Sequence, residues 1–128
     1  MGEVAVGTEP RLGRAAREEV WWALGHLINM EEHLFESGLS DQAAVVRDAR
    51  RHLAVEWGRA EGFDDGLFRR DWCVYKHAFS LLVHLQEVAV SAAAERPELA
   101  VAAWEAFRAI KDLLHLLTEY HRQGGGGG

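Results

Sequence analysis

Residues 97–122 read PELAVAAWEAFRAIKDLLHLLTEYHR, and this stretch decides the fold class. Pro97 suits the first turn of an α-helix, because proline has no backbone N–H to leave unpaired and its φ angle is already helical. Apolar side chains then recur at helical spacing and form one stripe, made by Ala103, Phe107, Ile110, Leu114 and Leu117. A strand would need sustained alternation of apolar and polar residues, which this stretch lacks. We therefore predict a helix that ends near Arg122.

Three more helices are predicted before Pro97. Residues 11–96 contain no proline, and alanine and leucine, which favour helices, are abundant. The expected ranges are 14–36, about 41–60 after the N-cap Ser40, and from Leu67 or Asp71 to Glu95. The connections are short, so consecutive helices should be antiparallel neighbours. The predicted fold is all-α, a four-helix up-down-up-down bundle.

The chain of 128 residues is long enough for one domain and too short for two ordinary ones. Residues 1–13 mix glycine, proline and charge, which predicts a flexible, disordered N-terminal arm. Residues 123–128 include five glycines, which predicts a flexible tail. The helical domain is therefore expected to span residues 14–122.

The composition excludes several classes of protein. Lysine and arginine number 14 against 20 aspartate and glutamate residues, so the net charge of −6 disfavours nucleic-acid binding through bulk charge. One cysteine allows neither an intramolecular disulfide nor a cysteine-rich metal cage. No apolar run approaches the roughly 18 residues of a membrane helix, and the start lacks the pattern of a signal peptide. We expect a cytoplasmic protein that makes no membrane contact.

The apolar stripes of the first three predicted helices define their expected core residues. The first helix contributes Val20, Leu24, Leu27, Ile28, Leu34 and Phe35. The second contributes Val46, Ala49, Leu53 and Trp57. The third contributes Val74, Ala78, Leu81, Leu82, Leu85, Val88 and Ala89.

Some apolar residues remain after the core is assigned. They are Trp22 on the first helix, Val83 and Val90 on the third, and Leu113, Leu116, Leu117 and Tyr120 on the fourth. Small monomers rarely expose a broad apolar patch, so this surplus favours association, most simply as a homodimer. We expect Trp22, Leu113, Leu116, Leu117 and Tyr120 at that interface, with the last helix as its seam. The other interpretation is that these residues are scattered on the surface or covered by the terminal arm.

Glu31 lies in the middle of the apolar stripe of the first helix. A buried carboxylate is unfavourable unless it is paired, and Arg50 and Lys111 are the candidate partners. The residue is interpreted either as half of a buried ion pair or as a functional carboxylate with a raised pKa.

The chain contains seven histidines, and two of them lie near its only cysteine. Cys73 and His77 are one helical turn apart and project to the same side, as two ligands of one metal ion would. His84 follows His77 by seven residues, about 10.5 Å along a helix. With Glu31 or His33 completing the shell, Cys73, His77 and His84 are candidate ligands for zinc or another transition metal such as iron. The alternative is that these are ordinary surface or boundary residues.

Arg47 and His52 form an Arg-x4-His string. Its spacing resembles the motif of HEPN-domain ribonucleases, small helical dimers whose arginine and histidine line a shared cleft. The resemblance covers six residues, has Asp48 where the family carries a polar residue, and falls on the second helix, whereas the family usually carries the motif later. It implies ribonuclease activity with Arg47 and His52 in the site.

Three functions therefore follow from the sequence. The first is a non-enzymatic helical protein that acts through self-association and through a protein partner. The second is a metal-binding protein, and the third is the ribonuclease. Walker A, Gly-x-Gly-x-x-Gly and Gly-x-Ser-x-Gly strings are absent, which disfavours the common nucleotide-binding and hydrolase classes.

Overall fold

The structure is a computed structural model, and it describes residues 12–122. Those residues form five helices and no strand, which confirms the all-α prediction. The helices are α1 (Arg14–Glu36), α2 (Ser40–Glu61), α3 (Asp65–Arg70), α4 (Trp72–Ala92) and α5 (Pro97–Arg122).

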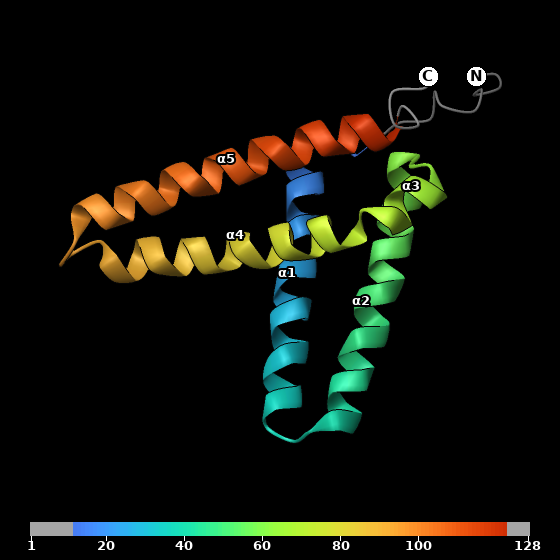
Figure 1. Ribbon diagram of the computed structural model, residues 1–128, viewed down its shortest axis with the longest axis horizontal. Coiled ribbons are helices and arrows are strands. Elements are labelled where there is room, and N and C mark those ends of the chain that lie inside the picture. The colour runs from blue at the N-terminus through green and yellow to red at the C-terminus, as the bar shows by residue number, and fades with distance from the viewer. Residues whose placement is uncertain (1–11, 123–128) are drawn as a thin grey trace.

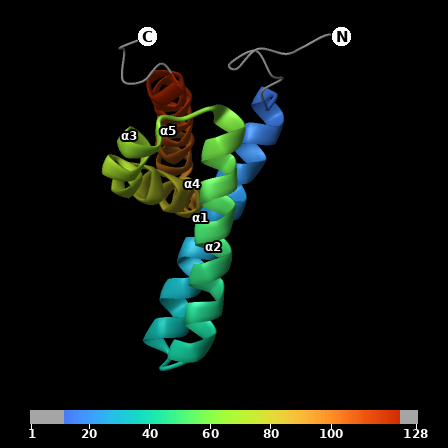
Figure 2. The same ribbon diagram turned by 90° about the vertical axis from the view of Figure 1, so that its right-hand side faces the viewer.

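The helices are arranged as two antiparallel hairpins that cross one another (Figure 1). One hairpin is α1–α2, and the other is α4–α5. Contact between the hairpins runs mainly through α1 and α4. Figure 2 looks nearly along α5, with α1 and α2 on one side of the α4–α5 hairpin. The antiparallel pairs match the expectation, but the single up-down-up-down bundle is not found, because the axes of the second pair run across those of the first.

Gly25 allows the hairpins to approach closely where they cross. A Cβ atom at this position would overlap the backbone carbonyl oxygen of Phe79 and press on the side chain of Val83. The hydroxyl of Ser80 donates a hydrogen bond to Oδ1 of Asn29 across the same contact, at 2.7 Å. The crossing therefore depends on a small residue in α1, a feature that an apolar-stripe analysis does not detect.

Several helix boundaries differ from their predictions. The expected third helix is divided into α3 and α4 at Asp71, and α4 ends at Ala92 instead of Glu95. Asp64 is the N-cap of α3, because its side chain accepts a hydrogen bond from the backbone N–H of Leu67 at 2.9 Å. Ser40 is the first residue of α2, not its N-cap, and the N-cap position is occupied by Leu39 without a side-chain hydrogen bond.

The core is centred on Trp57, at the end where the hairpins are joined. The rings of Phe63, Phe68, Tyr75 and Phe79 have their centroids 5.0–5.8 Å from the Trp57 ring. Edge-to-face aromatic contacts of this kind add stabilisation to the burial of apolar area. Most of the predicted core residues are buried or half-buried, as expected.

Several core predictions are wrong. The exposed ones are Phe35, Ala49, Val74, Leu81 and Val88, and Phe35 keeps 62% of its surface accessible. Val83, predicted to lie outside the core, is buried. The reason is the crossing: α4 turns Phe79 and Val83 towards α1, so the opposite side of α4 has no helix against it. Phe35 is the second-to-last residue of α1, so it lies at the turn between α1 and α2. That turn is far from the α4–α5 hairpin (Figure 1).

Most of the predicted flexible arm, residues 1–11, and the predicted glycine tail, residues 123–128, lie outside the described residues. Leu12, at the end of the predicted arm, is half-buried and packs against the core. Within residues 12–122, no helix has the length and apolarity needed to cross a membrane.

Candidate functional site

The α4–α5 hairpin carries an exposed apolar surface, which we call the outer face. Its members are Val74, Leu81 and Val88 of α4 and Leu99, Leu113, Leu116 and Tyr120 of α5, all exposed. Leu116 keeps 69% of its surface accessible, and Leu99 keeps 52%. Val74, Leu81 and Val88 are seven residues apart, as are Leu113 and Tyr120, so each helix repeats apolar residues along one side.

The outer face is directed away from α1 and α2. Phe79, which packs on α1 at Gly25, is about 160° around α4 from Leu81 at 100° per residue. The two helices meet at the far end of the hairpin, where Val88 and Ala92 of α4 and Leu99 of α5 line one groove. The apolar residues of both helices therefore belong to one surface.

The predicted interface residues are divided by the structure. Leu113, Leu116 and Tyr120 belong to the outer face, and the side chain of Leu117 is half-buried against the core beside it. Trp22 lies elsewhere: its ring packs inside the chain on Phe107, at a centroid distance of 5.5 Å. Trp22 points between α1 and α5, so it is not available at the outer face.

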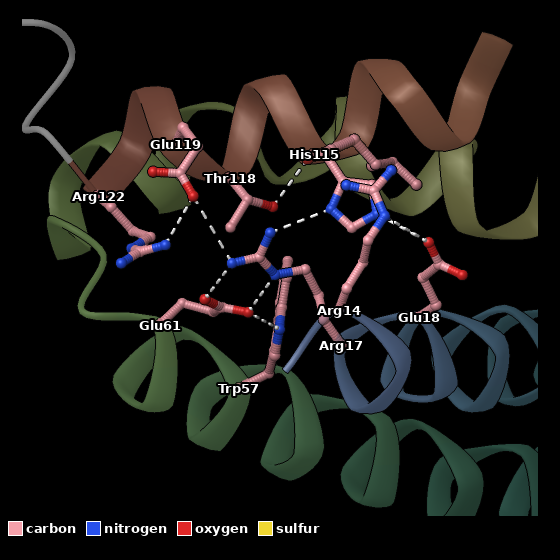
Figure 3. A network of polar contacts seen from close by, with 10 residues as sticks. Arg14, Arg17, Glu18, Trp57, Glu61, His115, Thr118, Glu119 and Arg122 are labelled. Atoms are coloured by element: carbon pink, nitrogen blue, oxygen red, sulfur yellow. Dashed lines mark hydrogen bonds and ion pairs between the residues drawn. The ribbon is translucent and has the colours of Figure 1, made fainter. Parts of the chain in front are cut away.

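A network of buried polar side chains joins α1, α2 and α5 on the other side of the hairpin (Figure 3). Arg17 donates to both carboxylate oxygens of Glu61, at 2.8 and 3.0 Å. The indole N–H of Trp57 donates to Glu61 as well, at 3.1 Å. Glu61 is only 1% exposed, so its charge depends on these donors. The geometry is that of a two-pronged arginine–carboxylate pair that holds α1 against α2.

His115 extends this network to the surface. Arg17 has only donors, so Nδ1 of His115 must accept the hydrogen bond from Arg17 Nη1 at 3.1 Å. The proton of the neutral ring then lies on Nε2, which donates to the Glu18 carboxylate at 2.8 Å. Burial opposes ionisation of Glu18, but the hydrogen bonds from His115 and Lys111 lower its pKa below the usual value. The network thus keeps His115 in one tautomer and Glu18 charged.

A second polar chain runs from the surface to the interior at the ends of α3 and α5. Asp71 accepts two hydrogen bonds from Arg70 and lies 2.8 Å from Nε2 of His121. The arginine, and then the histidine, hold the pKa of Asp71 well below its usual range. Nδ1 of His121 lies 2.6 Å from the hydroxyl of Tyr75 and 2.9 Å from the carbonyl oxygen of Leu117.

This Asp–His–Tyr order resembles a proton relay, but its last member is inaccessible. Tyr75 is fully buried, and burial raises the pKa of its hydroxyl. A neutral, buried phenol is neither a base nor a nucleophile that an external substrate can reach. The chain therefore serves to fix the end of α5 against the beginning of α4.

Glu31 is held by two arginines of α2. Arg50 donates to one carboxylate oxygen at 2.8 Å, and Arg47 donates to the other at 3.0 Å. Burial would raise the pKa of Glu31, but these two hydrogen bonds keep it below the usual value. Arg50 was one of the two predicted partners, whereas Lys111 pairs with Glu18 at 2.9 Å. The ion-pair interpretation of Glu31 is favoured over a carboxylate with a raised pKa.

The structure does not bring the candidate metal ligands together. Cys73, His77, His84 and His33 are all exposed, and Glu31 is held by its arginines in the other hairpin. Nδ1 of His84 lies 3.8 Å from the Glu87 carboxylate, and Nδ1 of His33 lies 3.9 Å from the Glu36 carboxylate, each on its own helix. Among residues 12–122, no three histidine, cysteine, aspartate or glutamate side chains are grouped as a metal ion would require.

Arg47 and His52, the residues of the ribonuclease motif, have different surroundings in the structure. The guanidinium of Arg47 is bonded to Glu31, and His52 lies on the exposed side of α2. Among residues 12–122, therefore, the arginine is occupied by Glu31 and no polar side chain orients the histidine.

The two buried polar networks were missed in the sequence, although a signal for them was present. Arg17 precedes Trp21 by four residues, Glu61 follows Trp57 by four, and His121 follows Leu114 by seven. Each polar residue thus extends an apolar side of its helix, which is the same signal that identified Glu31.

Comparison of this chain with protein-family models, with curated proteins and with solved structures finds no match.

Proposed function

We propose that this chain is a helical association protein that pairs with a second copy of itself through the outer face. The observation that carries the proposal is the exposed apolar surface along both α4 and α5. A monomer would leave this surface in water, at an unfavourable free energy of about 25 cal/mol per Å² of apolar area. A self-complementary contact between two copies is the commonest way in which proteins bury such a surface.

The dimensions of the outer face support this proposal. An α-helix rises about 1.5 Å per residue, so 20 paired residues of α4 and α5 form a surface about 30 Å long. Two packed helices are together about 20 Å wide. The projected area of about 600 Å² is of the order of the roughly 800 Å² that each partner contributes to a stable interface.

The test is the mass of the protein in solution. Wild type should be a dimer at micromolar concentration, and the double variant Leu113→Asp, Leu116→Asp should be a monomer, because a carboxylate in the contact would have to lose its water. Both positions are exposed in the single chain, so the variant should remain folded by circular dichroism.

The matched control places the same charges on the other hairpin. Val45 and Val55 are exposed apolar residues of α2, and the variant Val45→Asp, Val55→Asp should stay dimeric. A wild-type protein that remains monomeric at several hundred micromolar would overturn the proposal. A protein partner on the same face is a distinct outcome, in which wild type is monomeric until that partner is added.

A further inference from the structure

The residues beside the outer face repeat every seven positions, as its apolar residues do. Glu98, Glu105, Asp112 and Glu119 are each seven residues apart on α5, and all four are exposed. The corresponding edge of α4 carries His77, His84 and Ser91, also seven residues apart and exposed. The outer face therefore has one edge with four carboxylates, whereas the repeat on the other edge has none and has Glu87 beside it, 3.8 Å from Nδ1 of His84.

These edges are the two sides of the hairpin that face away from its own seam. Tyr75 and Leu82 of α4 are buried on the seam side, and Tyr75 reaches His121 of α5. At 100° per residue, His84 lies about 160° around α4 from Leu82. In a coiled coil, positions of this kind lie beside the apolar contact and select the partner helix by charge.

A second copy can cover the outer face in two symmetric ways. With the two-fold axis parallel to the helices, α4 lies on α5 of the partner subunit. With the axis perpendicular to the helices but still between the two faces, α4 lies on α4 and α5 lies on α5. The second arrangement sets the carboxylate edges of the two subunits against each other, and such like-charge contacts are unfavourable.

Building on the proposed self-association, we propose that two copies pair with the two-fold axis parallel to α4 and α5. The two hairpins then form an antiparallel four-helix bundle, in which each α4 contacts α5 of the partner subunit. The carboxylate edge of one subunit faces the histidine and serine edge of the other. The α1–α2 hairpins remain on the outside of this bundle, one on each side.

The hairpin itself sets the pairing of the edges. Because α4 ends at Ala92, α5 begins at Pro97, and Leu99 lines one groove with Val88 and Ala92, His84 lies at about the height of Glu105, and Ser91 at about the height of Glu98. Rotation about an axis parallel to the helices does not change the position of any residue along the helix direction, which is its height. His84 should therefore lie beside Glu105 of the partner subunit, and Ser91 beside Glu98 of the partner subunit.

The charges at these edges select the arrangement, whereas the apolar residues provide the affinity. His84 already has Glu87 at 3.8 Å on its own helix, and Asp112 has Arg14 at 3.9 Å. Glu119 is paired with Arg122 at 2.7 Å. Exposed pairs of this kind contribute little stability, but repeated contacts between like charges exclude a competing geometry.

The experiment first adds negative charge to the histidine and serine edge of α4, and then reverses the charge of the carboxylate edge of α5. In the variant His84→Glu, Ser91→Glu, new carboxylates face those of the partner subunit, so the dimer dissociation constant should rise by about tenfold or more. Adding Glu98→Lys and Glu105→Lys to the same chain should return the constant to within about threefold of wild type, because each lysine then faces a glutamate. Analytical ultracentrifugation measures these constants.

The two symmetric arrangements give opposite results for the fourfold variant. In the arrangement with α4 on α4, glutamates still face glutamates and lysines face lysines, so dissociation would persist. A fourfold variant that stays dissociated, or a double variant that pairs as tightly as wild type, overturns the pairing while the proposed self-association stands. A monomeric wild type overturns both.

A matched control makes the same exchange of charge away from the face. Asp48 and Arg51 are exposed on α2, and the variant Asp48→Lys, Arg51→Glu should leave the dissociation constant unchanged. All substituted positions are exposed, and circular dichroism and thermal unfolding establish that each variant is folded. A control that weakens the dimer as strongly as the double variant would also overturn the assignment of the edges.

Discussion

The α1–α2 hairpin contains three buried or half-buried ion pairs between its helices, whereas no ion pair joins α4 to α5 among the described residues. Arg17 with Glu61 ties one end of α1–α2, and Glu31 with Arg47 and Arg50 ties the other half. In α4–α5 the seam is apolar apart from the contact between the Tyr75 hydroxyl and His121. Ion pairs and hydrogen bonds are directional and are saturated by their own partners, whereas an apolar surface accepts any further apolar surface. The α4–α5 hairpin is therefore the one whose exposed apolar surface can still bind another protein surface.

The exposed apolar residues of the two hairpins also differ in their spacing along the helices. On α1–α2 they include Met30, Phe35 and Val45, whose spacing follows no seven-residue repeat. On α4–α5 they recur along both helices. Single exposed apolar residues are ordinary in proteins, but a repeated stripe is typical of a contact.

The largest effect is expected at Arg17, the buried arginine of the first hairpin. Replacing Arg17 by methionine leaves the buried carboxylate of Glu61 without its main partner, so the free energy of unfolding should fall by about 3–5 kcal/mol. Urea denaturation measures the loss. The matched control is Arg59→Met, which removes an exposed pair with Glu56 and should change stability by less than about 1 kcal/mol. Equal effects at both positions would contradict the role of the buried pair.

Leu82 provides the corresponding test in the apolar hairpin. Its side chain is 1% exposed, and Leu82→Ala should lower the free energy of unfolding by about 3 kcal/mol through lost burial and a cavity. Unlike an ion-pair contribution, this loss should not change with salt concentration between low and moderate ionic strength. The control Val90→Ala alters an exposed position and should stay within about 0.5 kcal/mol of wild type.

Gly25 tests the crossing between the hairpins. A methyl group at this position meets the backbone of Phe79, which cannot move as a flexible side chain would. Gly25→Ala should therefore destabilise the protein by about 1–3 kcal/mol, in spite of the better helix propensity of alanine. Gly13→Ala is the control, since nothing lies within 4 Å of its new Cβ. If Gly25→Ala stabilised the protein in thermal unfolding, the close approach of α1 and α4 would be disproved.

The smallest effect is expected at Glu31, and it depends on pH. The pKa of Glu31 is lowered in the folded state from 4.5, so its ion pairs stabilise the protein above that pH and lose their effect as pH falls through the lower folded value. Glu31→Gln should therefore cost about 1–2 kcal/mol at pH 7 and almost nothing at the most acidic pH at which the protein still folds. Denaturation curves at both pH values provide the comparison, and a difference that grew in acid would contradict the ion pairs.

Helix content, the short connections and the position of Pro97 could be predicted from the sequence because they depend on local chemistry. The ion pair of Glu31 with Arg50 was also predictable, because a carboxylate inside an apolar stripe requires a partner. The same logic would have found Arg17 and Glu61, since both extend apolar sides of their helices. Leu113, Leu116 and Tyr120 were correctly separated from the core of the single chain.

The wrong predictions concern how the helices meet. Placing Val74, Leu81 and Val88 in the core assumed a bundle with neighbours on several sides of α4. Trp22 was assigned to an interface because it projects away from the apolar stripe of its helix, and in the structure its ring packs on Phe107 of α5. The metal-ligand hypothesis likewise required Glu31 or His33 to complete a shell with Cys73, His77 and His84, and no such group forms among residues 12–122.

The amino-acid sequence by itself determined that this protein is helical, where its helices begin and end to within a few residues, and that it carries more apolar surface than one small core requires. Only the tertiary structure decided which side of each helix is buried. The physical reason is that an apolar stripe specifies that a helix must pack, but the angle and depth of packing depend on local shape, here the missing Cβ of Gly25 against the backbone of Phe79.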